Sequence, residues 1–463
     1  MSVIYRKIKK IIGPLVFLDN KHDVQYGEIV KIRSDDGKER TGQVVKMDMS
    51  TITIEVFEDT AGLSSENSII VFTEGSFKIK ISSDMFGRVF NSLGKPIDIN
   101  TKQVLESEIL TEIERDINGL PINPYAREYP SEVIQTGISV IDGLFTLIRG
   151  QKLPIFSGQG LPHNLLAAQI VTQAKVSADE PFLIIFCGIG IIQDEGIYFM
   201  KRFQESGNIQ NIISFINFAD DPIMERLIVP RVALTTAEYF AFEKEMHVLV
   251  ILIDMTNYAE ALRELSSAKE EIPSRKGYPG YLYTDFASIY ERTGKIKGKK
   301  GTITQLPILT MPGGDIAHPI PDTTGYITEG QLVLNSNLDK KGIYPPLEVL
   351  ASISRLMKDA IGKKTTREDH ADVSSQLLSS YSAALEVRDL ISIVGEDGLS
   401  FNQKALLKFG TVFEQTFLNQ SHTEERDIKT TLDLAWKALS HIPRNQLFRI
   451  RQEFIDKYYV GEV

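Results

Sequence analysis

The sequence predicts a multidomain α/β chain with an N-terminal β-barrel, a central α/β domain built on a parallel sheet, and a C-terminal helical bundle. Short β-rich runs fill the first 75 residues, apolar strands alternate with helices in the middle, and helical periodicity dominates the end. We expect domains at residues 1–75, 76–355 and 356–463. A chain of 463 residues is long enough for three domains.

The composition is typical of a globular protein with sizeable cores, since 42% of residues are apolar and 24% charged. The net charge of −10 argues against a nucleic-acid-binding protein. The basic run Lys295–Lys300 is short and interrupted by glycine, so we interpret it as a solvated loop.

Cysteine and hydropathy patterns favour the cytoplasm. Cys187 is the only cysteine, so no internal disulfide is possible, and its apolar surroundings predict packing rather than reactivity. No continuous apolar region follows the basic stretch Met1–Lys10, so no secretion signal is expected. The longest apolar run, Phe182–Ile192, is shorter than the roughly 20 residues a membrane span needs, so any membrane link would come through partners.

The N-terminal region reads as a small barrel because β-branched runs are separated by turns rich in Gly, Asp and Asn. The expected strands are Leu15–Leu18, Glu28–Ile32, Gln43–Met47, Thr51–Val56 and Ser68–Phe72. Phe86–Asp98 reads as a turn-rich connector, and Thr136–Gly150 as a short amphipathic helix.

The central region alternates strand and helix, which predicts a parallel sheet covered on both faces. The expected strands are Lys152–Phe156, Pro181–Phe186, Ile212–Phe218, His247–Ile253 and Gln305–Leu309. The expected helices are Leu165–Val176, Ile197–Ser206, Pro222–Lys244 and Tyr258–Glu270.

A glycine-rich turn, Ser157–Asn164, lies between the first of these strands and the first helix, where a phosphate-binding P-loop of the form G-x-x-x-x-G-K-[ST] would lie. Ser157 and Pro162 replace its glycines, His163 its lysine and Asn164 its hydroxyl residue.

These replacements degrade the loop. Pro162 has no N–H to donate, His163 lacks the reach and charge of a lysine ammonium, and Asn164 offers an amide where a hydroxyl would hold Mg²⁺. Gly158, Gly160 and the helix N-terminus remain, and these favour an anion. We expect weak or no nucleotide binding and no hydrolysis; alternatively, this is an ordinary glycine turn.

Asp254 ends the apolar run His247–Ile253, which is the Walker-B arrangement of a carboxylate beside a P-loop. Any buried strand can also end in Asp by chance. After residue 356 we expect helices at Leu377–Val394, Gln403–Gln415, Thr430–Ser440 and Arg444–Tyr458, forming a bundle.

Long strings in the sequence carry a family resemblance. They include R-G-Q-K-L-P-I-F-S-G-Q-G-L-P-H-N (149–164), H-V-L-V-I-L-I-D-M-T-N-Y-A-E-A-L-R-E (247–264) and S-R-L-M-K-D-A-I-G (354–362). With these strings the chain resembles the non-catalytic B subunit of V-type and archaeal-type rotary ATPases over nearly its whole length. The resemblance implies a β-barrel, a RecA-like P-loop-type domain and a C-terminal helical domain.

The resemblance also implies roles for individual residues. Arg355 would reach across an interface to the triphosphate in a partner's catalytic site, although a lone arginine in a serine-rich turn could also form a surface salt bridge. Arg231 matches a position near the phosphates of the chain's own site, and with the loop altered a structural role is the alternative. Gly190-Ile191 stands where catalytic relatives carry a water-activating Gly-Glu, so hydrolysis at this site is not expected.

The implied assembly has three copies alternating with three catalytic A subunits around a rotor shaft. The C-terminal domain would face the shaft, with the turn Gly395–Ser400 as a contact, and the barrel would meet the peripheral stalk. ATP or ADP with Mg²⁺ would lie at the interface with the A subunit, and no tightly bound cofactor or metal is expected in this chain. The complex would lie on the cytoplasmic side, peripheral to the membrane.

Three alternatives are open. A self-sufficient NTPase is opposed by the missing lysine and glutamate, and a RecA-class nucleic-acid motor by the acidic charge and the altered loop. A pure scaffold would leave Arg355 without a role in chemistry. The sequence does not distinguish protons from sodium ions, or synthesis from hydrolysis.

Overall fold

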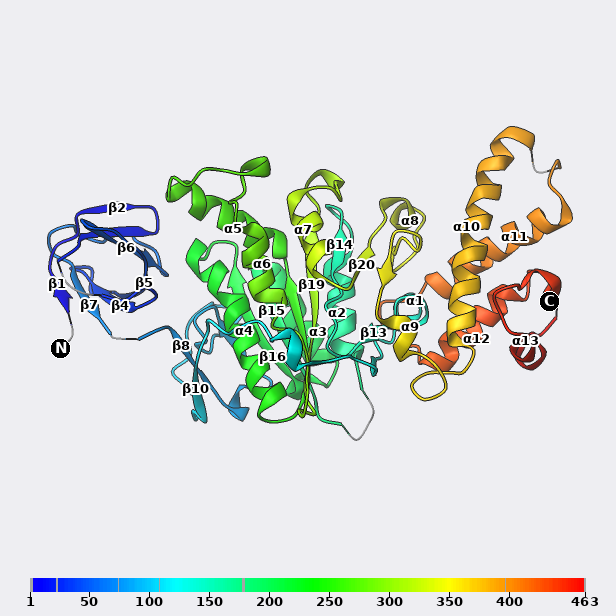
Figure 1. Ribbon diagram of the computed structural model, residues 1–463, viewed down its shortest axis with the longest axis horizontal. Coiled ribbons are helices and arrows are strands. Elements are labelled where there is room, and N and C mark those ends of the chain that lie inside the picture. Colours follow the sequence, from blue (N-terminus) through cyan, green and yellow to red (C-terminus); the bar gives the residue numbers. More distant parts are fainter. Residues whose placement is uncertain are drawn as a thin grey trace.

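The computed structural model describes residues 3–21, 24–73, 75–107, 109–176, 180–395 and 397–461, with backbone alone at 392–394. A barrel, a central α/β part and a set of helices follow one another along the long axis of the molecule (Figure 1). The chain therefore has the fold class that the sequence predicts.

The N-terminal part is one antiparallel sheet in the order β1-β7-β4-β5-β6-β3-β2. Its strands are β1 (Ile4–Tyr5), β2 (Lys10–Ile12), β3 (Leu15–Asp19), β4 (Ile29–Arg33), β5 (Glu39–Met47), β6 (Thr51–Val56) and β7 (Ile69–Phe72). The edge strands β1 and β2 are neighbours in the chain, so the sheet curls on itself around a core that includes Val16, Val30 and Ile54. The predicted strands are confirmed, and β1 and β2 are additional.

The connector after the barrel is more regular than the sequence predicts. Strands β8 (Lys78–Ile81) and β10 (Ile113–Asp116) pair with each other. The stretch Phe86–Asp98, predicted to be a turn-rich connector, also contains β9 (Val89–Asn91), which joins the central sheet beside β16. The sequence did not indicate this strand, because a run of three residues carries no period-2 signal.

The central sheet has the order β21-β20-β14-β19-β17-β15-β16-β9, and from β20 to β9 every described pairing on this path is parallel. Its longer strands are β14 (Ile155–Ser157), β15 (Phe182–Ile191), β16 (Ile212–Phe218), β17 (His247–Ile253), β19 (Thr302–Thr310) and β20 (Gly330–Val333). Short pieces complete it or lie beside it: β11 (Arg127–Glu128), β12 (Val133–Ile134), β13 (Leu147–Ile148), β18 (Gly294–Ile296) and β21 (Ile353–Ser354).

Helices cover both faces of this sheet, as its apolar strands require. Alternate residues of β15 enter two separate cores: Ile184 and Phe186 pack with α2 and α3, whereas Ile185 and Cys187 pack with α4 and α5. Cys187 is buried as predicted, and burial raises the pKa of its thiol. The helices are α1 (Ser139–Leu144), α2 (His163–Gln173), α3 (Gln193–Glu205), α4 (Ile223–Phe242), α5 (Met255–Ala268), α6 (Leu282–Tyr290), α7 (Pro319–Ile327), α8 (Ser336–Lys340) and α9 (Met357–Ala360).

Two local predictions near the loop need correction. The segment Thr136–Gly150 holds the short helix α1 and strand β13, and every residue of α1 is buried, so α1 is a core helix rather than an amphipathic one. The strand before the loop begins at Ile155 rather than Lys152. Lys152 forms only an isolated bridge with Gln305, and Pro154, directly before Ile155, has no N–H for a ladder.

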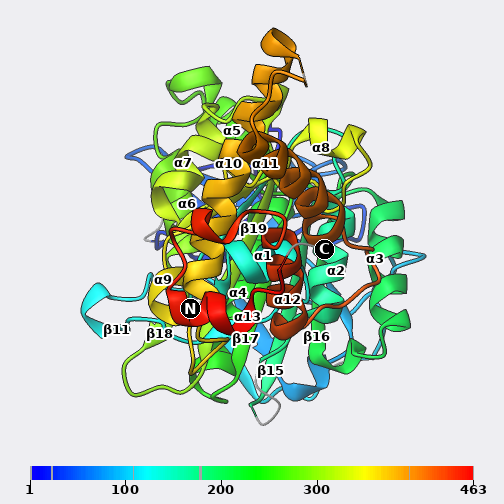
Figure 2. The ribbon, with the colours of Figure 1, turned by 90° about the vertical axis from the view of Figure 1, so that its right-hand side faces the viewer.

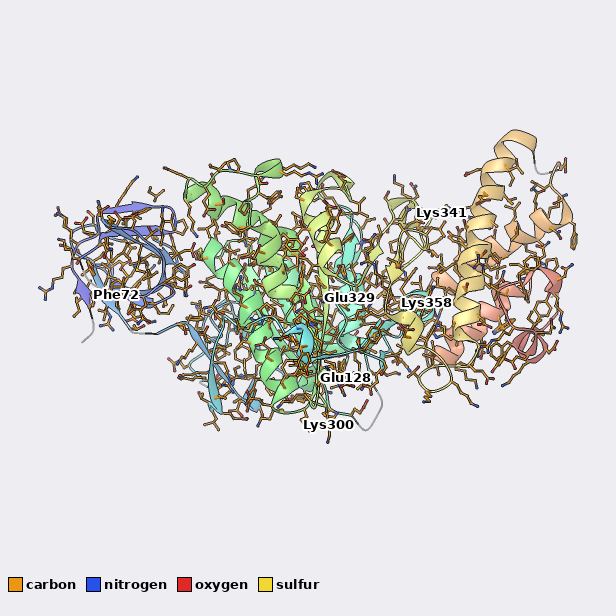
Figure 3. All side chains as sticks on the ribbon, viewed as in Figure 1. Phe72, Glu128, Lys300, Glu329, Lys341 and Lys358 are labelled. Carbon is orange, nitrogen blue, oxygen red and sulfur yellow. The ribbon has the colours of Figure 1, made fainter. Side chains whose placement is uncertain are left out.

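The basic run Lys295–Lys300 is only in part the solvated loop that the sequence predicts. Lys295 and Ile296 belong to β18, and Lys295 pairs with Glu128 at 3.2 Å. Residues 297–300 are exposed, and Lys300 lies at the lower rim of the molecule in Figure 3.

The C-terminal helices pack against the far end of the central part, and they face the viewer in Figure 2. They are α10 (His370–Val394), α11 (Phe401–Val412), a π-helix (Phe413–Leu418), α12 (Ile428–Leu439) and α13 (Gln452–Tyr458). The predicted helix Arg444–Tyr458 is wrong in its first half, where a 3-10 turn (Arg444–Gln446) and an irregular stretch precede α13. Of the predicted rotor-contact turn, Glu396 lies outside the described residues.

Candidate functional site

The carboxyl ends of β14, β19 and β17 bring the predicted loop and the predicted Walker-B carboxylate together. Ser157 at the end of β14 is in register with Thr310 at the end of β19. Asp254 follows β17 directly and hydrogen-bonds to Thr310. This edge of a parallel sheet is where ligands bind in α/β proteins.

The loop between β14 and α2 is closed by its own side chains. The Ser157 hydroxyl lies 3.0 Å from the Gly158 carbonyl oxygen and 3.0 Å from Nδ1 of His163. The hydroxyl has a single hydrogen, so both contacts are satisfied when it donates to Gly158 and accepts from His163 Nδ1–H. The side chain at the lysine position therefore turns back onto the strand. Gly160 has φ +80°, which favours glycine at the turn.

The start of α2 offers few free donors to an anion. Pro162 has no N–H, and the N–H of His163 donates to the Leu161 carbonyl oxygen at 2.8 Å. The Asn164 amide donates to Oε1 of Glu195 at 2.7 Å, which ties α2 to the first turn of α3.

The Asp254 carboxylate is occupied by protein donors. It accepts the Thr256 N–H at 2.8 Å, which caps α5, and the Thr310 N–H at 3.1 Å. The Thr310 hydroxyl donates to its other oxygen at 2.5 Å. Asp254 thus joins a helix N-terminus to the neighbouring strand.

Gly190 and Ile191 form the last two residues of β15 rather than following it. Ile191 is 3% exposed and packs in the core formed with α2 and α3. Gly190 has φ +61°, and a Cβ there would lie 2.8 Å from Nε of Arg226. An apolar, buried side chain therefore stands where catalytic relatives are expected to carry a carboxylate.

Arg231 on α4 does not contact the loop. Its guanidinium pairs with Asp285 on α6 at 3.2 Å and also donates to Ser288. It lines a cavity of about 830 Å³ between the barrel and helices α4, α5 and α6, and residues 157–164 do not line this cavity. A second ion pair, between Lys269 and Glu55 at 3.0 Å, also lies in the lining of this cavity.

Arg355 lies directly after β21 at one edge of the central sheet and is exposed. Its N–H donates to the Glu329 carbonyl oxygen at 3.0 Å, and Nη1 donates to the Thr328 carbonyl oxygen at 3.3 Å. In the part of the chain that the structure describes, no acidic side chain forms an ion pair with it. The salt-bridge alternative therefore has no partner among these residues.

Clusters of metal ligands and membrane-spanning helices are both absent from the described residues. Among residues 3–461 without the gaps given above, no group of three or more His, Cys, Asp or Glu residues could hold a metal ion. Within the same ranges, every helix is too short or too polar to span a membrane.

Three family models match successive parts of the chain. Residues 8–74 match the beta-barrel domain of the ATP synthase alpha/beta family, and residues 137–354 match its nucleotide-binding domain. Residues 359–459 match the C-terminal domain of V and A type ATP synthase. Each of the three parts of the chain therefore matches a domain of ATP synthase subunits.

Full-length relatives agree with these matches. A V-type ATP synthase beta chain from Halothermothrix orenii is 54% identical over 99% of this chain and 98% of its own length. The B subunit of an A-type ATP synthase from Aeropyrum pernix is 53% identical over 98% of this chain and 97% of its own length.

A solved structure of a unique ATP synthase subunit, NeqB from Nanoarcheaum equitans, superposes with a TM-score of 0.73. It is 42% identical, and the match covers 92% of this chain and 98% of that one. The fold and the three successive family matches define a subunit of the ATP synthase alpha/beta type. The chain belongs to the ATP synthase alpha/beta family, in the branch whose members are named as V-type beta chains or A-type B subunits.

The residues that hold Arg355 and the loop in place could not be inferred from the sequence. The Asn164–Glu195 contact and the contact of the Gln151 amide with Ser354 join segments far apart in the chain. Gln151 is fully buried, yet it lies in the string R-G-Q-K-L, close to Arg149 and next to Lys152. The local sequence therefore gives no sign that this amide is inside the protein.

Proposed function

We propose that this chain is the non-catalytic B subunit of a V-type or A-type rotary ATPase, and that it contributes Arg355 in trans to the active site of a catalytic A subunit. Arg355 carries the proposal. The residue is exposed at a sheet edge, its backbone N–H and its Nη1 each donate to a backbone carbonyl oxygen, and no carboxylate of the described residues pairs with it.

The chemistry of phosphoryl transfer explains the value of such a residue. Negative charge develops on the equatorial oxygens of the transferred group, and a positive charge placed there stabilises the transition state. An arginine supplied in trans contributes about 10³–10⁵ in rate, which corresponds to roughly 4–7 kcal/mol of barrier.

The chain's own loop supports a non-catalytic role. His163 is held by Ser157, Pro162 provides no donor, and Asp254 is engaged by Thr310 and Thr256. Ile191 offers no base to activate water. The residues at this loop do not fit a phosphate and Mg²⁺ in the way a working P-loop would, so we propose weak or no nucleotide binding here.

The proposed partners follow from this role. Three copies would alternate with three A subunits, with ATP or ADP and Mg²⁺ at the interface that Arg355 faces. The C-terminal helices would meet the rotor shaft and the barrel the peripheral stalk. The head would lie on the cytoplasmic side, attached to the membrane only through other subunits. We propose no nucleic-acid partner.

The test is ATP hydrolysis by this chain assembled with its catalytic partner, with and without Arg355→Ala. A scaffold without a role in chemistry is the second candidate, and it predicts equal turnover in both. The family membership alone does not discriminate between these two.

A further inference from the structure

The position of Arg355 depends on the segment that leads into β20. Its backbone N–H is held by the Glu329 carbonyl oxygen and its Nη1 by the Thr328 carbonyl oxygen. Among the described residues, β21 pairs only with β20, with Gly330 in register with Ser354 and Gln331 with Ile353. A two-residue ladder at the sheet edge thus leads directly to the arginine. So short a ladder needs additional anchors to hold one geometry.

Gln151 supplies such an anchor from the other side. It is 0% exposed, and its Nε2 donates to the Ser354 hydroxyl at 2.9 Å and to the Glu329 carbonyl oxygen at 3.3 Å. Its Oε1 accepts the Ile148 N–H at 3.0 Å, which fixes the amide orientation, because the oxygen must face that donor. The Ser354 hydroxyl in turn donates to the Thr146 carbonyl oxygen at 3.2 Å. One buried amide thus contacts β21 and the segment that leads into β20.

The segment before β20 is also clamped to Lys152. The Glu329 carboxylate accepts the Lys152 N–H at 2.8 Å and pairs with its Nζ at 2.7 Å, and the Lys152 side chain is only 3% exposed. Figure 3 shows Glu329 in the central domain, on the side toward Lys358 of α9. Gly330 allows the close approach of the two strands, since a Cβ there would clash with the Ile353 carbonyl oxygen.

We propose that Gln151 is a positioning residue for Arg355: its amide fixes the paired strands β20 and β21 so that the guanidinium is presented to the partner's active site in one geometry. This inference rests on the proposed trans role of Arg355. Gln151 touches neither substrate nor guanidinium, and it acts through Ser354 and Glu329. A misplacement of about 1 Å in a catalytic group can lower a rate about a hundredfold.

The test is a double-mutant cycle in the assembled ATPase with Gln151→Met and Arg355→Ala. Methionine keeps the length and burial of Gln151 but has no N–H to donate. In the chain with Arg355 present, Gln151→Met is expected to lower kcat about tenfold or more with KM for ATP little changed. In the Arg355→Ala chain, the same change is expected to lower kcat no further.

The matched control is Gln331→Met. Gln331 lies on β20, and its amide donates to the Ala351 carbonyl oxygen at 3.3 Å, but it contacts neither anchor of Arg355. We expect its kcat to equal that of the unmodified complex. If Gln151→Met prevents assembly, Ser354→Ala removes one arm of the same tether and enters the cycle instead.

The outcomes separate the two proposals. Equal losses from Gln151→Met in both backgrounds would show a general structural role and overturn the positioning inference, while Arg355→Ala could still be strongly impaired. An unchanged rate for Gln151→Met in the presence of Arg355 would overturn it as well. If Arg355→Ala leaves kcat unchanged, the proposed trans role of Arg355 is rejected, and the inference about Gln151 is rejected with it.

Discussion

Nδ1 of His163 lies 3.0 Å from the hydroxyl of Ser157, so the residue at the P-loop lysine position is bonded to the strand that precedes the loop. A lysine there would extend toward bound phosphates. In this chain the histidine at that position hydrogen-bonds within the loop, so the altered site is a turn closed by its own hydrogen bonds.

Restoring the loop should restore nucleotide binding. Changing Pro162→Gly, His163→Lys and Asn164→Thr together returns the cradle flexibility, the ammonium and the Mg²⁺-binding hydroxyl. We expect the affinity of the isolated chain for Mg²⁺-ADP to rise at least about tenfold, as measured by isothermal titration calorimetry. His163→Gln alone is the control, because it breaks the contact with Ser157 without adding a cation. Binding by the unmodified chain as tight as that of the triple variant would contradict this view of the loop.

Adding only the missing carboxylate should harm the protein rather than create catalysis. Ile191 is 3% exposed in the core, so Ile191→Glu would bury an unpaired carboxyl group. We expect a loss of about 3 kcal/mol or more in the free energy of unfolding, against about 1 kcal/mol for Ile191→Val as the size control. Urea denaturation followed by circular dichroism measures both. A stable Ile191→Glu chain that hydrolyses ATP would show that the side chain reaches the loop.

The sequence predicts the architecture well because its signals are local. Strands such as His247–Ile253 and Ile212–Phe218 are fully buried runs that end at turn residues, so their bounds match β17 and β16. The pairing of β20 with β21 was not predicted, because β21 has two residues and is defined by pairing alone.

Side-chain partners depend on contacts between distant segments, which a sequence does not show. Arg231 was expected near the chain's own phosphate loop, yet its hydrogen bonds go to Asp285 and Ser288 on α6. Asp254 was expected beside the loop, and it lies there, but Thr310 from β19 occupies its carboxylate. The sequence singled out both charged residues. It did not show which side chains each of them hydrogen-bonds with.

The junction of the C-terminal helices with α1 should be sensitive to acid. His370 is fully buried, with Nε2 3.0 Å from the Gly143 carbonyl oxygen and Nδ1 3.0 Å from the Thr366 hydroxyl. Burial lowers its pKa from 6.5 to about 4, with neighbouring Asp369 and Arg367 acting in opposite directions. Between these two pKa values the unfolded chain therefore binds a proton that the folded chain does not.

The stability that His370 contributes is thus complete above about pH 6.5 and is lost as the pH falls from there toward 4. The full loss is about 3 kcal/mol by the linkage relation. The difference between the urea midpoints at about pH 7.5 and pH 5 should be smaller for His370→Gln than for the unmodified chain. His422→Gln, at an exposed site, should leave this difference unchanged. An identical pH dependence in the His370→Gln chain would contradict this assignment.

The trans role of Arg355 makes the sharpest prediction. Its guanidinium is exposed, held by the Thr328 carbonyl oxygen, and unpaired with any acid among the described residues. Arg355→Ala should remove a charge at the partner's active site, and Arg355→Lys should restore little, since a lysine lacks the planar fork that contacts two phosphoryl oxygens.

The most direct test is steady-state ATP hydrolysis by the complex of this chain with its catalytic partner, comparing unmodified chain and Arg355→Ala, with assembly checked by size-exclusion chromatography. We predict a fall of about a hundredfold or more in turnover with assembly intact, and no turnover by this chain alone. Unchanged turnover in the Arg355→Ala complex would contradict the account and leave the chain as a scaffold.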